Sequence, residues 1–388
     1  MRSHNVGFVV VTAGYLAATT AESLLAPVFP QVGRDLGMGT GAAGATFAIL
    51  AASIAVGGLA GGFVLARLGP RAGVVLALAL VTGGALAAAA AGRPATFVAA
   101  QIALGGGSGL FFAPGIRSAA LLSGARRRGL AMALFGIAFS GGLALAGALA
   151  VLGAAWGWRT SFVVTAAFAA AVAVPIAFVR VPSPPSARSR RVTRAGLRAA
   201  LATPLRVGGV AAVSQYGTIA FIPLFAVQAW GLSPAAAALM LTVARIASVP
   251  AKLVSGNAAD GVGAIRIARR LGLLLVVLGA WWTLFPGAAA AALGAVAFAA
   301  FVSGLAPVAN VLALDSFEEH AELLGAFRSA QIGFGAAASA LLGLGASLIG
   351  LRASLVVAAV IVPATLLRLG PRTDEVGQAG TDAPSTPT

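Results

Sequence analysis

Gly62-Phe-Val-Leu-Ala-Arg-Leu-Gly69 recurs 194 residues later as Gly256-Asn-Ala-Ala-Asp-Gly-Val-Gly263, in a chain of 388 residues. Both segments follow a long apolar run, and both begin and end with glycine. Other segments keep this spacing to within one residue: Gly37-Met38 with Gly231-Leu232, and Gly157-Trp158-Arg159 with Gly350-Leu351-Arg352. One such pair could arise by chance among 51 glycines. Several pairs at a single offset indicate that the two halves of the chain are repeats of each other.

The apolar runs between these segments have the length of membrane-spanning helices. Hydrophobic residues make up 59% of the chain and charged residues only 9%, against about 25% charged residues in soluble domains. A helix needs about 20 apolar residues to cross a bilayer. We expect twelve spans, near residues 6–29, 44–65, 72–91, 95–116, 129–152, 159–179, 207–230, 234–258, 271–287, 289–314, 323–349 and 352–369. The expected fold is therefore an all-α membrane protein with two parallel six-helix repeats.

The net charge of +16 lies in short clusters between the apolar runs, which favours a topological role over nucleic-acid binding. If both termini face the cytoplasm, only Arg34, Arg93, Arg159 and Arg352 lie outside, Arg245 lies within a span, and the other 21 of the 26 Lys and Arg residues lie inside. This bias predicts a multi-pass protein of the inner membrane with both termini in the cytoplasm.

Four segments follow from this topology. We expect an N-terminal six-helix half at 1–180, a cytoplasmic linker at 181–206, a C-terminal six-helix half at 207–369 and a disordered tail at 370–388. Proline, serine and arginine are frequent in the linker segment, which is typical of a connection at the cytoplasmic face.

The segment from Gly256 to Gly263 resembles the loop signature of the major facilitator superfamily, and the resemblance extends over nearly the whole chain. In that family an acidic residue of this loop caps a neighbouring helix, pairs with an arginine and holds the cytoplasmic gate. The resemblance assigns this role to Asp260, whereas Ala66 occupies the equivalent place in the first half. The expected gating residues are Arg67, Gly69, Arg71, Gly256, Asp260 and Gly263.

The first span, from Thr20 to Pro30, is similar to that of proton-linked drug and sugar efflux members of the family, which place a glutamate eight residues before a proline. Glu22 has this position. Two departures stand against the antiporter branch. Gln101 stands where many antiporters carry a membrane arginine, and the fifth span lacks the Gly-Pro pair of the antiporter signature.

Charged side chains inside spans are functional candidates, because charge at bilayer depth costs about 2.5–3.5 kcal/mol even on permissive scales. Glu22 could carry a proton or counter a cationic substrate, or it could make a structural hydrogen bond. Arg245 could bind an anionic substrate, pair with Glu22, or serve only in packing. The further candidates lining the path are Tyr216, Gln215, Gln101 and Asn310, and each of these could equally make a hydrogen bond between helices.

The leading hypothesis is a secondary transporter that exports a lipophilic or cationic compound by proton coupling. The alternative is a carrier of small organic or inorganic anions that uses Arg245. A cavity of net negative charge would favour the first, and one of net positive charge the second. A non-transporting membrane protein is a third possibility. We expect no enzyme activity, no cofactor and no metal site, because there are no cysteines, only two histidines and no nucleotide-binding motif. The expected partners are a small-molecule substrate, membrane lipids and a co-transported proton, and we expect a monomer.

The charge bias predicts the outcome of a topology experiment. A fluorescent reporter fused after Arg372 should be active, and a phosphatase that works only in the periplasm should be inactive at the same position. A periplasmic signal from that fusion would overturn the expected orientation.

Overall fold

The computed structural model describes residues 2–38, 40–181, 194–232, 234–318, 320 and 322–370. Every regular element within these ranges is a helix. Residues 371–388 of the expected tail and residues 182–193 of the expected linker lie outside the described residues. The last part of the expected linker belongs to α6, which begins at Arg194.

The N-terminal half consists of α1 (Arg2–Leu36), α2 (Thr40–Ala89), α3 (Pro94–Ser123), η1 (Ala125–Arg127), α4 (Arg128–Trp156) and α5 (Trp158–Phe178). The 50-residue α2 contains two spans, because Gly69 has non-helical backbone angles (φ 79°, ψ 173°) directly before Pro70. The expected second and third spans therefore form one kinked element. A positive φ is accessible to glycine at little cost, and the proline ring is tolerated in the first turn of the second segment.

The C-terminal half consists of α6 (Arg194–Ala212), η2 (Val213–Thr218), α7 (Ile219–Trp230), α8 (Pro234–Val262), α9 (Ala264–Leu284), α10 (Ala288–Ser316), α11 (Glu322–Ile349), α12 (Leu351–Val356), η3 (Val357–Ile361), α13 (Val362–Ala364) and η4 (Thr365–Arg368). The seventh span is one path through α6, η2 and α7, and the twelfth runs from α12 to η4. The predicted break at Pro286-Gly287 is confirmed, because it separates α9 from α10.

Ten helical segments of the described chain are long and apolar enough to cross a membrane. One of them, Ala45–Ala89, has 45 residues and holds two spans on either side of Gly69. With α8, whose Arg245 and Lys252 lower its hydropathy, the described helices account for all twelve expected spans.

The repeat predicted from the sequence reappears in the backbone. Gly37 and Gly231 have φ values of 65° and 66° at the ends of the first and seventh spans. Gly69 and Gly263 have φ values of 79° and 99° before the third and ninth spans, and Gly157 and Gly350 form a third pair at 90° and 86°. Glycine is therefore required at the same turns in both halves, because L side chains are strained at positive φ.

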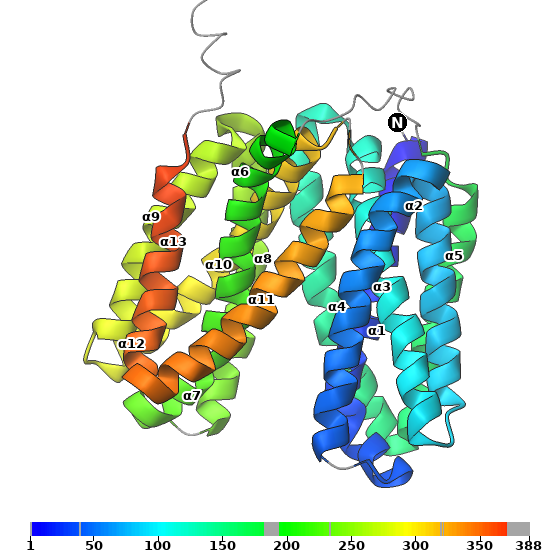
Figure 1. The fold of residues 1–388 in the computed structure, drawn as a ribbon, viewed down its shortest axis with the longest axis horizontal. Helices are drawn as coiled ribbons and strands as arrows, with labels where there is room; N and C mark the ends of the chain where they lie inside the picture. The colour runs from blue at the N-terminus through cyan, green and yellow to red at the C-terminus, as the bar shows by residue number, and fades with distance from the viewer. Residues whose placement is uncertain are drawn as a thin grey trace, which may run out of the picture.

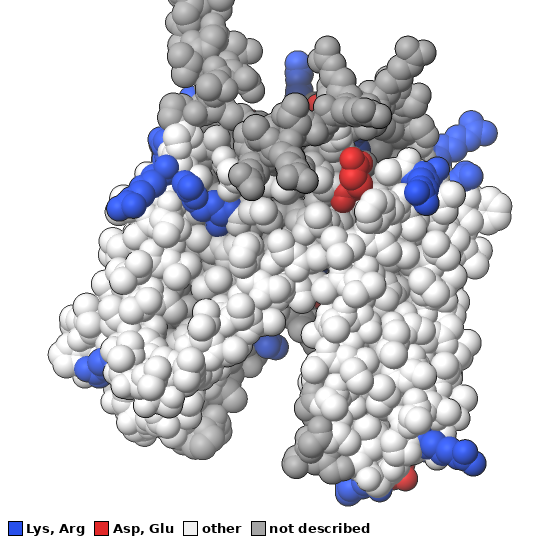
Figure 2. All heavy atoms as spheres, in the orientation of Figure 1, with Lys and Arg blue, Asp and Glu red and all other residues white. Residues whose placement is uncertain are grey.

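The two halves lie side by side, meet at one end and separate toward the other (Figure 1). We call the end that contains Gly69 and Gly263 the closed end, and the end that contains Gly37 and Gly231 the open end. Figure 2 shows a hollow between the halves at the open end, and it shows most of the visible basic side chains near the closed end.

Glycine backbones hold the halves together at the closed end. A Cβ atom built on Gly129 of α4 would overlap the carbonyl oxygen of Gly256 of α8, and the converse also holds. Likewise, a Cβ atom on Gly62 of α2 would overlap the Glu322 carbonyl of α11, and one on Gly325 of α11 would overlap the Gly58 carbonyl. Each contact joins a helix of one half to a helix of the other. Small residues permit such close helix packing in membranes.

Polar groups reinforce this contact. Asp260 accepts hydrogen bonds from the backbone N–H groups of Gly129 and Leu130, at 2.6 and 3.0 Å. These donors lie in the first turn of α4, so Asp260 caps a helix of the opposite half. Arg128, beside them, forms an ion pair with Asp315 at 3.0 Å and approaches Glu318 at 3.7 Å.

The first loop, Gly62 to Gly69, lacks the polar contacts that the second loop, Gly256 to Gly263, makes through Asp260. The side chains of Arg67 and Arg71 are exposed, and within the described chain neither has a recorded hydrogen bond or ion pair. This asymmetry agrees with the alanine at position 66, which leaves the first loop without an acid to act as a cap.

The glycine contact predicts how the closed end can be forced apart. In Gly129→Ala, the added methyl group has no space against the Gly256 carbonyl, so the closed end should open more often. Because the natural chain has no cysteine, a single cysteine placed at Ser303 can report access to the interior. Labelling by an impermeant maleimide from the closed-end side should rise severalfold. Gly147→Ala, in the same helix and with no atom within 4 Å of the added Cβ, is the control. Equal labelling of both variants would contradict the role of this contact.

Candidate functional site

A cavity lies between the two halves and encloses about 900 Å³, including the part open to solvent. Seven lining residues come from α1, α3 and α4 of the N-terminal half, and thirteen come from α6, η2, α8, α10 and α11 of the C-terminal half. Both halves therefore contribute side chains to one cavity.

The C-terminal half supplies a polar surface. Nine of its thirteen lining residues carry polar or charged side chains: Gln215, Tyr216, Arg245, Ser248, Lys252, Ser303, Asn310, Arg328 and Gln331. Gln215 and Tyr216 lie in η2, which is a π-helical segment of the seventh span. Such segments inside helices are frequent at functional sites, because the extra residue re-aims the side chains.

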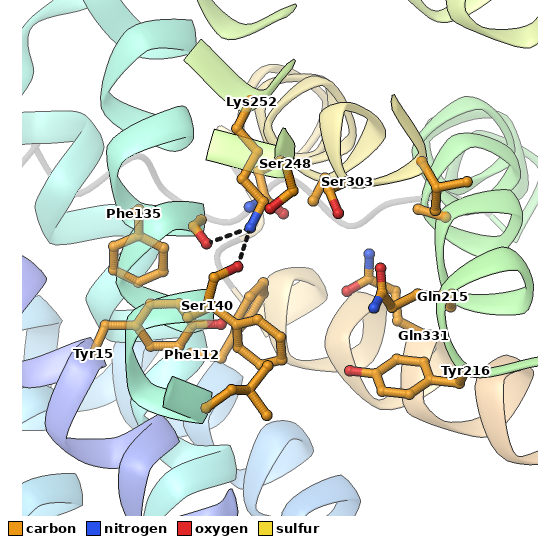
Figure 3. A pocket seen from close by; sticks show the side chains of 18 of the residues that line it. Tyr15, Phe112, Phe135, Ser140, Gln215, Tyr216, Ser248, Lys252, Ser303 and Gln331 are labelled. Atoms are coloured by element: carbon orange, nitrogen blue, oxygen red, sulfur yellow. Dashed lines mark hydrogen bonds between the residues drawn. The ribbon is translucent and has the colours of Figure 1, made fainter. Parts of the chain in front are cut away.

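The N-terminal half supplies an aromatic wall, formed by Tyr15, Phe112, Phe135 and Phe139 (Figure 3). Tyr15 and Phe135 are stacked with ring centroids 3.9 Å apart and planes inclined by 5°. Tyr15 also contacts Phe112 edge-on at 6.4 Å. Tyr15, Phe112 and Phe135 are buried, so the wall is held firmly by its own packing.

Three cations line the cavity, namely Arg245, Lys252 and Arg328, and no lining residue is acidic. None of the ion pairs found in the described part of the chain includes any of the three. Transfer of a charge out of water is costly unless an opposite charge or strong hydrogen bonds compensate for it. The cavity therefore has a net positive lining whose charges are not neutralised inside it.

Lys252 illustrates this imbalance. It is only 4% exposed. Its Nζ donates hydrogen bonds to the Gly136 carbonyl and to the Ser140 hydroxyl, both in α4 (Figure 3). These partners are neutral, and they belong to the opposite half. Lys252 thus joins the two halves within the cavity while its charge remains uncompensated.

Arg328 lies at the boundary between the polar surface and the aromatic wall. Its guanidinium carbon is 4.9 Å from the ring centroid of Phe112, a cation–π contact. It forms a side-chain hydrogen bond with Tyr216 and lies within electrostatic reach of Tyr15 and Glu22. The charge count of the sequence places Arg328 among the cytoplasmic residues, and this prediction is wrong, because Arg328 lines the cavity. Gln331, one helical turn further on, also lines the cavity, and this i, i+3 pair of polar residues was the signal in the sequence.

Glu22 lies behind the lining rather than in it. Its carboxylate accepts a 2.6 Å hydrogen bond from Ser108 of α3, whose hydroxyl also approaches the Ala18 carbonyl at 3.1 Å. Its charged neighbour is Arg328. No ion pair between Glu22 and Arg245 is found among the described residues.

The structure therefore brings together four of the six substrate candidates, Tyr216, Gln215, Arg245 and Asn310. Gln101 does not belong to the cavity: it is fully buried in α3, and its amide has no hydrogen-bond partner among the described residues. The candidate gating residues Gly256 and Asp260 lie at the contact between the halves. Sequence reasoning missed the following cavity residues: Lys252, Ser140, Tyr15, Phe135 and Phe139. The described side chains form no cluster of three acidic or histidine residues suited to a metal ion.

Twelve spans in two repeated halves, with a cavity between them and close contact at one end, form the architecture of a membrane transporter. A model of the Major Facilitator Superfamily matches residues 11–207, which is half of the chain. The protein belongs to this superfamily. A search of curated proteins finds no match to the sequence.

Solved structures support the same fold. The Escherichia coli fucose:proton symporter FucP is 15% identical, with a TM-score of 0.79 over 94% of this chain and 98% of FucP. A structure of FucP in the outward conformation has a TM-score of 0.80 at the same identity, over 94% of this chain and 99% of that one. The human organic anion transporter MFSD10 is 18% identical, with a TM-score of 0.71 over 94% of this chain and 99% of MFSD10.

Proposed function

We propose that this protein is a secondary transporter of a small organic anion. The observation that carries the proposal is the charge of the cavity: Arg245, Lys252 and Arg328 line it without any acidic lining residue. An anionic substrate would supply the charge that these cations lack. A bound carboxylate or phosphate would also gain charge-assisted hydrogen bonds, which are stronger than neutral ones.

This charge favours the anion carrier over the efflux of a cationic compound, which was the leading hypothesis from the sequence. A cation in this cavity would face three like charges at close range. The names of the structural neighbours do not decide the matter, since one is a sugar symporter and another an organic anion transporter. We therefore base the substrate class on the lining of this chain.

We assign the closed end to the cytoplasm of the inner membrane, on the arginine bias of the sequence. The present state then faces outward. Opening the other way would require the halves to separate at Gly129 and Gly256, to release Asp260 from α4 and to break the bridge from Lys252 to Ser140. Transport would alternate between these states by rocking of one half against the other.

We assign proton coupling to Glu22. It is close to the cavity cation Arg328 and is connected to α3 through Ser108. Its charge partly offsets that of Arg328, so protonation of Glu22 would strengthen the pull of Arg328 on an anion. Proton and anion would then bind together, and this arrangement favours symport of the two over antiport.

Neutralising a cavity cation should weaken anion binding. Arg245 is exposed to the cavity, so Arg245→Gln should retain the fold while losing a charged hydrogen-bond donor. Such a bond contributes about 1.5–3 kcal/mol, so benzoate should bind roughly tenfold to a hundredfold more weakly, as measured by calorimetry on the purified protein. Arg93→Gln, which removes an exposed arginine at the start of α3, is the matched control. Equal binding by both variants would remove Arg245 from the site.

Replacing Glu22 should uncouple transport from the proton gradient. Glu22→Gln retains an oxygen that can accept the Ser108 hydrogen bond, but it cannot ionise. In proteoliposomes, an inward proton gradient should no longer accelerate benzoate uptake, whereas exchange of internal for external benzoate should continue. Asp35→Asn, at the open end beside Trp158 and Arg159, is the control. Stimulation by the gradient in Glu22→Gln would show that the proton is carried elsewhere.

A further inference from the structure

The two halves line the cavity with different kinds of side chain. The N-terminal side presents Tyr15, Phe112, Phe135, Phe139 and Leu143, whereas its polar lining groups are few. Of these few, the Ser140 hydroxyl and the Gly136 carbonyl are already bound to Lys252. In Figure 3 the rings of Tyr15, Phe112 and Phe135 lie on one side of the cavity, and Gln215, Tyr216 and Gln331 lie on the other.

We propose that the substrate is an amphipathic organic acid, with its acidic group held by the C-terminal half and an aromatic or similarly flat apolar body packed on the wall of the N-terminal half. This proposal rests on the proposed function and specifies it further. It assigns Phe139 of the aromatic wall and the lining residue Leu143 as specificity residues, because both side chains are only partly buried and so remain available to a ligand.

Two cations mark the border at which the acidic group would meet the apolar body. Arg328 packs over the Phe112 ring, and Lys252 reaches across to α4 beside the wall. An acid bound between them would place its next carbon atoms against the aromatic rings. Aromatic rings favour offset-stacked or edge-to-face contacts with other rings, which gives the body a preferred plane.

Smaller or fully polar ligands fit this arrangement less well. Inorganic phosphate or acetate could satisfy the cations, but it would leave the wall in contact with water, and burial of apolar surface is what stabilises such contacts. A sugar needs hydrogen-bond partners on all sides, and the wall offers it mainly the Tyr15 hydroxyl.

A graded series of acids tests the proposal on the purified full-length protein. Acetate, benzoate and 1-naphthoate carry the same carboxylate on bodies of increasing size, and 1-naphthamide carries the largest body without the charge. Affinity measured by calorimetry should rise at least tenfold from acetate to 1-naphthoate, and 1-naphthamide should bind at least tenfold more weakly than 1-naphthoate.

Variants locate the two parts of the ligand. Phe139→Ala should lower the affinity for 1-naphthoate about tenfold and leave the affinity for acetate unchanged. Arg245→Gln should lower the affinity for both acids. Phe63→Ala is the matched control, because Phe63 of α2 is 59% exposed and does not line the cavity. Phe139→Leu, together with thermal melting of each variant, separates a loss of binding from a loss of folding.

The outcomes distinguish the proposal of an amphipathic acid from the underlying proposal of an anion transporter. If acetate or phosphate binds as tightly as 1-naphthoate, or if Phe139→Ala and Phe139→Leu weaken both acids equally, the apolar body is refuted while the anion transporter stands. If 1-naphthamide or fucose binds as tightly as 1-naphthoate, or if none of the acids binds, both proposals fail.

Discussion

The backbone contact between Gly129 and Gly256 is the interaction on which the rest of the architecture depends. It brings α4 and α8 together at one end, so the two six-helix halves separate toward the other end and leave a cavity between them. No larger side chain fits at either position in this state. Asp260 then places its carboxylate on the first turn of α4, where N–H groups lack helical partners. The closed end thus combines close packing with one charge-assisted cap.

The two walls of the resulting cavity differ in the polarity of their side chains. The N-terminal half contributes rings stacked on one another, and the C-terminal half contributes amides, hydroxyls and cations. Lys252 and Arg328 extend from the polar side to the aromatic side, so each contacts both halves. Under the proposed function, a ligand bound to these cations would act on the same side chains that join the halves. Binding would then be linked to the change of access through these contacts.

Glu22 adds a single negative charge behind this positive lining. Its connection to Ser108 and its proximity to Arg328 place it where protonation would alter the field of the cavity. Arg245, by contrast, faces the cavity without a carboxylate partner. The two candidate charges identified in the sequence thus differ in position, since Glu22 lies behind the lining near Arg328 and Arg245 is exposed to the cavity.

The sequence alone determined the twelve spans, the repeat and the glycine turns, because these depend on local properties: apolar length, and the backbone angles that only glycine adopts readily. It also identified Arg245, Tyr216, Gln215 and Asn310, since polar groups are conspicuous in apolar helices. Only the tertiary structure decided that Arg328 and Lys252 face the cavity and that Gln101 does not. A residue near a helix end can reach solvent or the interior, and the choice depends on which neighbouring helix covers it. The net charge of the cavity is likewise a sum over the eight elements that line it, from α1 to α11, and no local sequence pattern contains it.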